Sequence, residues 1–506
     1  MFVQSTLFEG KRSLIFNSYV FIFAFLPVVF AGCWLLGFGR RQGAVFIWLS
    51  LASLFFYGWW NPAYVILILL SLIFNYAWIR LLTVNRTMRW RRFLLVMGIG
   101  VNLFVLGYYK YANFFIDTAN ELTGANLYWE PVILPLGISF LIFLHIACLV
   151  DVYRGEVKDT DFIRYCLFVT FFPKLVMGPI VRHREIFPQL IRSEIIGIKA
   201  ENVSVGLTVF LIGLFKKTVL ADNMAVYATP VFGAAENAGM IHLVDAWTGA
   251  LAYTFQLYFD FSGYTDMAIG VSRLFGIVLP PNFYSPYKSL NIMDFWRRWH
   301  MTLSRFLRDY LYIPLGGNRK GELRYCLNLL VTMSLCGLWH GAGWTFVLWG
   351  FCHGMIMTAN HVWRKLSDHW GFNRDRRFYK GLAWFCTFIA VVCLWVVFRA
   401  RTIDGALNLL RGMVGMNGLS FDYLGYHFVD SGSFYWILAC FVIVLFMPNT
   451  HQLMHDHHAF PTGIKGEERS RWAWKPSWKW ALIGAVMALC SFLSLSTVTE
   501  FLYFQF

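Results

Sequence analysis

Apolar runs of about the length that crosses a lipid bilayer recur from one end of this sequence to the other. A hydrocarbon core of about 30 Å takes roughly 17–25 apolar residues in a helix. Inside lipid only helices and closed barrels satisfy every backbone hydrogen bond, and runs such as YVILILLSLIF lack the alternation of a barrel strand. We therefore predict an all-α polytopic integral membrane protein. Its candidate spans are 14–36, 45–60, 64–82, 93–109, 132–150, 162–180, 204–222, 246–262, 325–338, 342–360, 381–399, 433–448 and 478–496.

The composition excludes most soluble functions. Only 14% of the residues are charged, whereas an average soluble protein has about a quarter. The net charge of +15 is spread over loops that flank the apolar runs, which favours membrane topology and anionic lipid headgroups over nucleic acid as its explanation. The ten cysteines form no CxxC pair, so neither disulfides nor a zinc site is expected.

The loops also predict an orientation. The first span is too long for a signal peptide and no small-residue cleavage site follows it, so we expect it to be retained. The loop after the fourth span has Lys110 against three acidic residues. The loop after the third span is basic and contains Arg80, Arg86, Arg89, Arg91 and Arg92. Because positive loops stay in the cytoplasm, the amino terminus is predicted to be periplasmic. No internal repeat or long polar segment divides the chain, so residues 1–506 are predicted to form one integral-membrane domain.

The stretch NIMDFWRRWHMTLSRFLRDYLYIPLGGNRKG (291–321) combines charge, aromatic residues and glycine. Apolar residues at three- and four-residue spacing are Trp296, Trp299, Leu303, Leu307 and Tyr310, and the other faces have Arg297, Arg298, Arg305 and Arg308. This pattern predicts an amphipathic helix at the membrane boundary, with His300 on its apolar face. Two interpretations of the arginines stay open. They anchor the helix on lipid phosphates, or they bind an anionic donor such as the phosphates of coenzyme A.

The stretch SLCGLWHGAGW (334–344) places His340 in a strongly apolar setting. An ionisable group at membrane depth is a functional candidate, because burying it is costly. A neutral imidazole there can accept a proton from a hydroxyl as a general base, and Gly341 and Gly343 leave room for a ligand or a neighbouring helix. The alternative is a histidine that is simply hydrogen-bonded to another helix. A second histidine in an apolar setting, His300, favours chemistry.

The stretch QLYFDFSGYTDMAIG (256–270) contains two carboxylates, Asp260 and Asp266, which fall on different faces of a continuous helix. Ser262 and Gly263 are candidates for a break in that helix. Polar packing of broken helices is the favoured role. A glycosidase-like carboxylate pair or a metal dyad is the alternative.

Other histidines are weaker candidates. The stretch HQLMHDHH has spacing that could bind zinc but lacks an accompanying HExxH or cysteine set, so no metal is predicted. The residues concerned are His451, His455, His457 and His458, and two further histidines within apolar runs are His145 and His353.

The two stretches DFWRRWHMTLSRFLRDYLYIPLGGNRKG and LCGLWHGAGWTFVLWGFCHG together resemble the membrane-bound O-acyltransferase (MBOAT) family, in its bacterial branch that acetylates exported polysaccharides such as alginate. Further segments resemble that branch in the expected order, among them LGYYKYANFF (106–115), FFPKLVMGPIVR (171–182) and YFDFSGYTDMAIG (258–270). The resemblance implies a ring of about 11–14 transmembrane and re-entrant helices around a central tunnel, with a catalytic core at about 130–360. It also implies that His340 is the catalytic residue and His300 its partner.

The resemblance further implies an O-acetyltransferase of the bacterial inner membrane that uses acetyl-CoA from the cytoplasm and has no bound cofactor. Its expected partners are a periplasmic acetyltransferase and the machinery that makes and secretes an exopolysaccharide such as alginate or cellulose. Arg297, Arg298 and Arg308 are then expected to hold the donor phosphates. Trp296 and Trp299 are further candidates for donor binding and are expected to fix the helix at the interface. The alternatives are O-acetylation of peptidoglycan, D-alanyl transfer to teichoic acid, and a conduit that moves acyl or glycan groups without chemistry.

Overall fold

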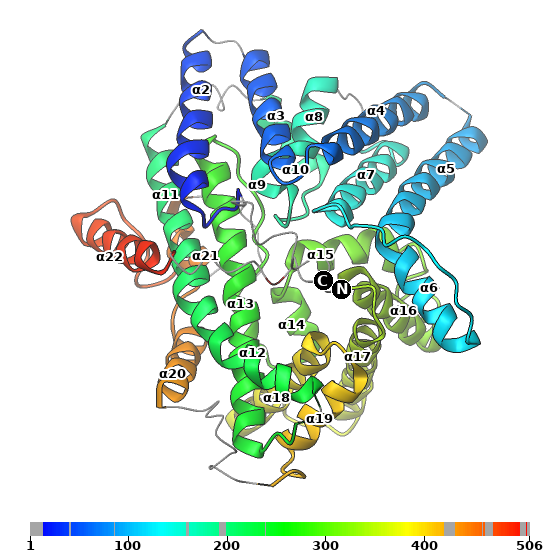
Figure 1. The fold of residues 1–506 in the computed structure, drawn as a ribbon, viewed down its shortest axis with the longest axis vertical. Coiled ribbons are helices and arrows are strands. Elements are labelled where there is room, and N and C mark those ends of the chain that lie inside the picture. The colour runs from blue at the N-terminus through cyan, green and yellow to red at the C-terminus, as the bar shows by residue number, and fades with distance from the viewer. Residues whose placement is uncertain are drawn as a thin grey trace.

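The computed structural model describes residues 14–39, 42–85, 87–157, 161–191, 199–237, 239–418, 431–457, 459–460, 469–495 and 502. Within these ranges all regular secondary structure is helical (Figure 1), which confirms the all-α prediction. Helical segments that are long and apolar enough to cross a membrane are Phe21–Phe38, Ala63–Val84, Met88–Thr123, Ala200–Glu236 and Arg377–Arg399. Shorter apolar helices are Gln42–Gly58, Ile138–Tyr153, Gly432–Phe446 and Trp478–Ser494.

The first group of helices forms one end of the molecule (Figure 1). Its members are α2 (Leu26–Phe38), α3 (Gln42–Gly58), α4 (Ala63–Val84), α5 (Met88–Leu106), α7 (Ile138–Tyr153), α8 (Phe162–Thr170) and α10 (His183–Ile191). Their apolar side chains pack inward around a cluster of phenylalanines, in which Phe172 contacts Phe21, Phe25 and Phe56. Burial of such aromatic surface stabilises the packing at this end.

Two predicted spans differ from the structure here. The span predicted at 93–109 does not end in a loop, because α5 continues through a π-helical turn, η2 (Gly107–Tyr111), into α6 (Ala112–Thr123). Lys110 can stay inside this helical segment because its ammonium reaches backbone carbonyls of another helix. The helix ends at Gly124, which has the positive φ of 66° that glycine accommodates without strain.

The span predicted at 162–180 is also wrong. It is divided into α8, of nine residues, and α9 (Phe172–Leu175), of four. Nine residues of helix rise only about 14 Å, too short to cross the lipid. The break has a local cause, since the amide of Phe172 donates to the Ser53 hydroxyl oxygen over 3.0 Å and Pro173 has no amide hydrogen to continue the helix.

Closely packed glycines join two long helices in the middle of the fold. The first runs through α11 (Ala200–Phe215), η4 (Lys216–Ala221) and α12 (Asp222–Glu236), and it lies against α13 (Leu243–Leu274). A Cβ atom added at Gly263 would lie 2.7 Å from the carbonyl oxygen of Gly213, and one added at Gly270 would lie 2.6 Å from that of Gly206. Small residues allow such backbones to approach each other inside a membrane. The predicted break at Ser262 and Gly263 is therefore wrong, because α13 is continuous and Gly263 serves this contact.

A second glycine contact joins α16 (Glu322–His340) to α17 (Trp344–His369). A Cβ atom at Gly337 would lie 2.0 Å from the Phe346 carbonyl oxygen, and one at Gly350 would lie 2.1 Å from that of Met333. This contact packs the last turns of α16 closely against α17. The remaining helices are α18 (Arg377–Arg399), α19 (Ile403–Met413), α20 (Ser431–Phe446), α21 (Thr450–Leu453) and α22 (Trp478–Ser494).

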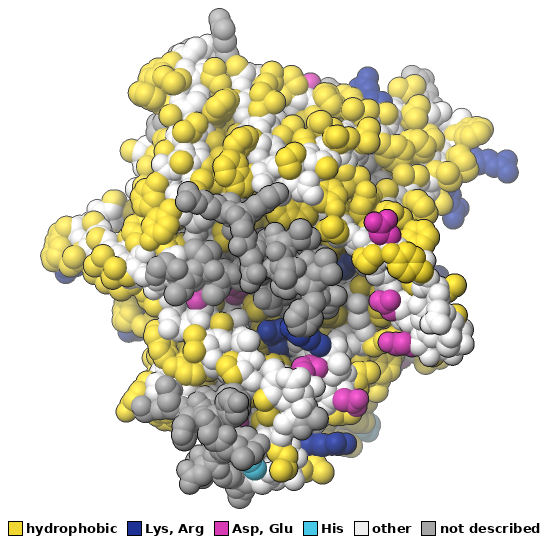
Figure 2. All heavy atoms as spheres, viewed as in Figure 1, with side chains coloured by type: hydrophobic (Ala, Val, Ile, Leu, Met, Phe, Trp, Pro, Cys, Tyr) yellow, Lys and Arg dark blue, Asp and Glu magenta, His cyan; other side chains and the backbone are white. Residues whose placement is uncertain are grey.

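Short helices lie near the middle of this arrangement. Figure 1 shows α14 (Ile292–Arg298) and α15 (Met301–Leu307) between α12 and α13 on one side and α16 and α17 on the other. The visible outer surface is largely hydrophobic over the amino-terminal helices (Figure 2), where exposed side chains include Leu69, Ile73 and Phe104. An apolar exterior around a polar-containing centre is what a membrane-embedded fold requires.

The α11–α13 contact predicts a clear difference between two glycines. Gly263→Ala should destabilise the protein, because the new methyl group meets a carbonyl oxygen that belongs to a packed helix. Gly233→Ala is the matched control, since a Cβ there meets nothing within 4 Å and alanine favours a helix by about 0.5–1 kcal/mol. Thermal unfolding in detergent should show a lower midpoint for the first variant and an equal or higher one for the second. Equal midpoints would remove the role assigned to Gly263.

Candidate functional site

His300 lies at a break between α14 and α15. Its φ of 42° places it in the left-handed region, which a side chain other than glycine adopts only at a cost in free energy. The stretch predicted as one amphipathic helix is therefore three short pieces, α14, α15 and the π-helical η6 (Arg308–Tyr312). The break turns the His300 ring into the protein, where only 1% of the residue is exposed.

Asn282 holds this strained turn in place. The chain before α14 runs beside the break. The amide of Met301 donates to the backbone carbonyl of Asn282 over 2.9 Å, and the amide of Tyr284 donates to the backbone carbonyl of Arg298 over 3.0 Å. The side-chain Oδ1 of Asn282 accepts a 2.6 Å hydrogen bond from the Thr302 hydroxyl. Backbone strain persists where surrounding bonds over-determine it, and it is concentrated at functional sites.

The same asparagine fixes the tautomer of His300. Asn282 Oδ1 can only accept, so the 3.3 Å contact to His300 Nδ1 requires a proton on that nitrogen. In the neutral ring the other nitrogen, Nε2, then carries a lone pair. Nε2 has no hydrogen-bond partner among the described residues. His300 therefore presents an unused acceptor in a buried setting.

His340 is the last residue of α16 and faces His300. The centroids of the two rings are 6.5 Å apart. Trp349 and Phe398 stand edge-on to His340, with ring centroids 5.4 and 5.3 Å away. Both histidines line a cavity of about 20 Å³, which has room for roughly one water-sized group. The other residues that line this histidine cavity are Met177, Leu257, Asp260, Phe261, Trp299, Trp395, Phe398 and Leu502.

The two glycines after His340 differ in what surrounds them. A Cβ at Gly341 would lie 2.1 Å from the Phe346 ring, so Gly341 gives room for the start of α17. A Cβ at Gly343 would make only an ordinary 3.5 Å contact with the same ring. The predicted close approach of a neighbouring helix is therefore found at Gly341, whereas Gly343 begins α17 as its N-cap without such crowding.

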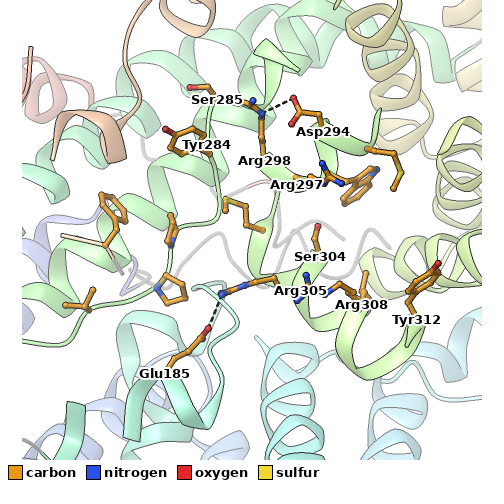
Figure 3. Close-up of a pocket in the computed structure, with 18 of the residues that line it drawn as sticks. Glu185, Tyr284, Ser285, Asp294, Arg297, Arg298, Ser304, Arg305, Arg308 and Tyr312 are labelled. Atoms are coloured by element: carbon orange, nitrogen blue, oxygen red, sulfur yellow. Dashed lines mark hydrogen bonds and ion pairs between the residues drawn. The ribbon is translucent and has the colours of Figure 1, made fainter. Parts of the chain in front are cut away.

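A much larger pocket lies beside the histidine cavity. It has a volume of about 1850 Å³, and its lining includes seven basic and three acidic residues. Figure 3 shows Arg297 and Arg298 of α14 on one side of the opening and Arg305 and Arg308 of α15 and η6 on the other. Guanidinium groups recognise carboxylates and phosphates in a bidentate way. We call this space the arginine pocket.

Most of these arginines are paired with a carboxylate. Arg298 contacts Asp294 at 3.0 Å, and Arg305 contacts Glu185 at the same distance. Arg308 and Arg182 both form ion pairs with Asp309. Arg297 makes no ion pair in the part of the chain that the structure describes. It is therefore the arginine of α14 whose charge is least compensated.

Asp309 links this pocket to the rest of the fold. Its partial burial would raise the pKa of the carboxyl group. The hydrogen bond from Arg308 and the charges of Arg182 and Arg308 outweigh that effect and hold the pKa below its usual value. Asp309 is thus a carboxylate that locks η6 to the segment before α10.

The two tryptophans of the motif are not interfacial anchors. Trp296 lines the arginine pocket and donates its indole N–H to His353 Nδ1 over 3.2 Å. Trp299 lines the histidine cavity, stacking on Phe295 at 5.6 Å and lying 4.8 Å from Trp395. Both are buried, because the break at His300 directs this face into the protein instead of into lipid headgroups. Their roles in donor binding stay predictions.

Asp260 and Asp266 form separate ion pairs with two neighbouring lysines. Asp260 accepts from Lys217 at 2.7 Å, and Asp266 accepts from Lys216 at 2.6 Å. Asp260 also lines the histidine cavity. Buried charges require such partners. The geometry favours the packing role over a catalytic dyad. In the sequence, the two adjacent lysines inside the apolar run 204–222 are the feature that could have indicated these ion pairs.

The weaker histidine candidates that the structure describes are not grouped into a metal site. His145 is fully hydrogen-bonded, to the Ser71 hydroxyl at 2.9 Å and to the Tyr165 hydroxyl at 2.8 Å. Among the residues described, no group of three or more His, Cys, Asp or Glu side chains is placed to hold a metal ion, and His458 lies outside them. His353, in contrast, belongs to the aromatic wall beside His340, where it contacts Trp349.

Sequence reasoning missed two residues. Asn282 was not singled out, because its role depends on a chain reversal that brings 282–284 beside 298–301. Lys110 was placed in a loop, although a lysine within an otherwise apolar run is itself a candidate for a buried residue with a functional role.

Comparisons with known proteins identify the family to which this chain belongs. A profile of the family described as "MBOAT, membrane-bound O-acyltransferase family" matches residues 107–400, which include both histidines. A peptidoglycan O-acetyltransferase of Helicobacter pylori is 43% identical over 437 residues, 81% of this chain and 82% of that protein. A protein named "Probable alginate O-acetylase AlgI", from Pseudomonas putida, is 38% identical over 514 residues, 97% of this chain and 100% of the relative. A teichoic acid D-alanyltransferase of Streptococcus thermophilus is 28% identical over 298 residues, 53% of this chain and 69% of the relative.

The matched profile covers more than half of the chain, and the acetylase relative aligns along almost all of it. These findings confirm the resemblance carried by the two histidine motifs. The chain belongs to the membrane-bound O-acyltransferase family and is a multi-pass membrane O-acyltransferase.

Proposed function

We propose that this protein transfers an acetyl group from acetyl-CoA in the cytoplasm toward a polysaccharide that is exported across the bacterial inner membrane. The observation that carries the proposal is that two buried histidine rings, with centroids 6.5 Å apart, lie beside the arginine pocket. Family membership favours an enzyme over a passive conduit.

The arginine pocket has the size and charge that a phosphorylated donor needs. Pockets for drug-sized ligands are about 300–1,000 Å³, so a space of about 1850 Å³ takes a larger molecule. Its excess of basic residues suits the phosphates of coenzyme A. Residues 296 to 301 divide the two spaces, since Trp296 and Met301 line the pocket while Trp299 and His300 line the histidine cavity.

The thioester can reach the histidines along α16. Met333 of this helix lines the arginine pocket and His340 lines the cavity, seven residues later. Seven residues rise about 10 Å along a helix, which is a distance that the long thiol arm of coenzyme A can span. The histidine cavity, at about 20 Å³, must widen to admit the acetyl group.

In the proposed reaction His340 acts as general base. It takes the proton from the acceptor hydroxyl as the oxygen attacks the thioester carbonyl carbon. A C–O bond forms, the C–S bond breaks, and the proton passes to the departing thiolate, so that free coenzyme A is released. His300, held with Nδ1–H toward Asn282, keeps Nε2 available to accept a hydrogen bond or relay that proton.

The acceptor is an exopolysaccharide such as alginate or cellulose in this proposal, with a separate periplasmic acetyltransferase as partner. O-acetylation of peptidoglycan is the second candidate, because the relative that carries this name is 43% identical over 81% of the chain. D-alanyl transfer has less support, since the D-alanyltransferase relative aligns over 53%. Mass spectrometry of the secreted polymer and of peptidoglycan fragments, with and without the protein, separates the first two.

His340→Ala is expected to lower acetyl transfer by about 10²–10⁴-fold, the usual worth of a general base. The measurement is the release of free coenzyme A from acetyl-CoA by purified protein in liposomes supplied with an acceptor glycan. His369→Ala is the matched control, because His369 is exposed at the far end of α17. Undiminished release by His340→Ala, with the variant present in normal amount, would refute the role of this histidine. Movement of the acetyl group without breakage of the thioester would instead support the conduit.

Arg297→Gln tests the donor pocket separately. Loss of a charge-assisted contact to a phosphate should raise the KM for acetyl-CoA roughly tenfold, whereas the KM for S-acetylpantetheine, which lacks phosphates, should not change. Arg376→Gln, at an exposed arginine before α18, is the control. An unchanged KM for acetyl-CoA, or an equal rise for both donors, would mean that Arg297 does not hold the phosphates.

A further inference from the structure

The last turn of α16 ends at His340, and a distant part of the chain binds it. The hydroxyl of Tyr111 donates to the Leu338 carbonyl over 3.0 Å. The ammonium of Lys110 donates to the carbonyls of Trp339 and His340, the latter at 3.1 Å. The remaining carbonyl of this turn, that of Gly337, accepts from the amide of Gly341. All four final carbonyls of the helix therefore have partners.

Such complete pairing has a physical reason here. The last four carbonyls of any helix lack partners within the helix, and inside a membrane no bulk water replaces them. The C-terminal end of a helix also carries partial negative charge, which a cation stabilises. Lys110 satisfies both needs with one group. Without it the turn that carries His340 would lose the hydrogen bonds that Lys110 donates to the carbonyls of Trp339 and His340.

Lys110 and Tyr111 are the last two residues of the π-helical turn η2, and both side chains reach the same end of α16. Single π turns are frequent at functional sites. The Lys110 ammonium also lies 5.9 Å from the centre of the Trp339 ring, which stacks on Phe143 at 5.1 Å.

We propose that Lys110 is a positioning residue for His340, holding the last turn of α16 so that the two histidine rings face each other. This inference rests on the proposed acetyl transfer, in which His340 acts as the base. Lys110 is not in contact with the arginine pocket, so its effect should fall on the chemical step and not on donor binding. A catalytic group misplaced by about 1 Å can lose about 10²-fold in rate.

The test replaces Lys110 with side chains of similar length. Lys110→Met, which keeps the length but removes the charge, should lower kcat for release of coenzyme A by about 10²-fold and leave the KM for acetyl-CoA unchanged. Lys110→Arg should recover a large part of kcat, because a guanidinium can donate to the same two carbonyls. Lys365→Met is the matched control. Lys365 pairs with Glu322 at the opposite end of α16, and its loss should alter neither constant.

A second measurement does not depend on activity. Amide hydrogen exchange of residues 338–341 should become faster in Lys110→Met, since an uncapped helix end frays, and should stay at the wild-type rate in Lys365→Met. Tyr111→Phe removes a single hydroxyl and should give a smaller increase in the same segment. This milder variant covers the case in which Lys110→Met does not fold.

The outcomes separate the two proposals. If the wild-type protein releases coenzyme A and Lys110→Met retains its kcat, the positioning role is wrong and the proposed function stands. The positioning role is also wrong if Lys110→Arg does not recover the kcat that Lys110→Met loses, or if the KM of Lys110→Met for acetyl-CoA rises by the same factor as its kcat falls. If the wild-type protein releases no coenzyme A, the proposed function fails, and unchanged exchange at 338–341 would show that Lys110 does not hold the helix end either.

Discussion

The hydrogen bonds of Asn282 are the constraint on which the rest of the site depends. They hold His300 at a φ of 42°, and this break turns the residues around it away from the membrane boundary and into the protein. The same side chain fixes which nitrogen of His300 carries its proton. Without this turn the sequence from 291 to 312 would form an ordinary surface helix, and His300 would not face His340. The strained backbone lies where the two histidine rings face each other, and the paired backbone segments around it hold that strain in place.

Charge is distributed around the site in two different ways. Next to the histidine cavity, charges are buried and compensated, as where Lys217 pairs with both Asp222 and Asp260 at 2.8 and 2.7 Å. These pairs give the buried lysine and carboxylates of the wall the partners that buried charges require. In the arginine pocket, by contrast, basic residues outnumber acidic ones, and Arg297 has no carboxylate partner in the described ranges. A positively charged pocket beside the two histidines is the arrangement that the proposed transfer from an anionic thioester requires.

The sequence was sufficient for the fold class and the family, and it predicted the two histidines that the structure brings together, because these depend on local composition and on motifs with specific spacing. It was not sufficient for the path of the backbone. The pattern around Trp296 and Trp299 indicated an amphipathic helix, since periodicity cannot reveal a break that is stabilised by Asn282, a residue outside the pattern. The run 162–180 appeared continuous for the same reason, because its break depends on a hydroxyl of α3. Lys110 was assigned to a loop because its partners lie more than two hundred residues later in the chain.

The central claim is that the donor thioester reacts between His300 and His340. A cryo-electron microscopy structure with acetyl-CoA bound to the His340→Ala protein, or with a non-reactive analogue bound to the native protein, tests it most directly. The account predicts the nucleotide phosphates beside Arg297 and, in the native protein, the carbonyl carbon within about 4 Å of the site between the two rings, the separation of a near-attack geometry. A donor seated elsewhere, or rings that remain sealed from the arginine pocket with the donor bound, would contradict it.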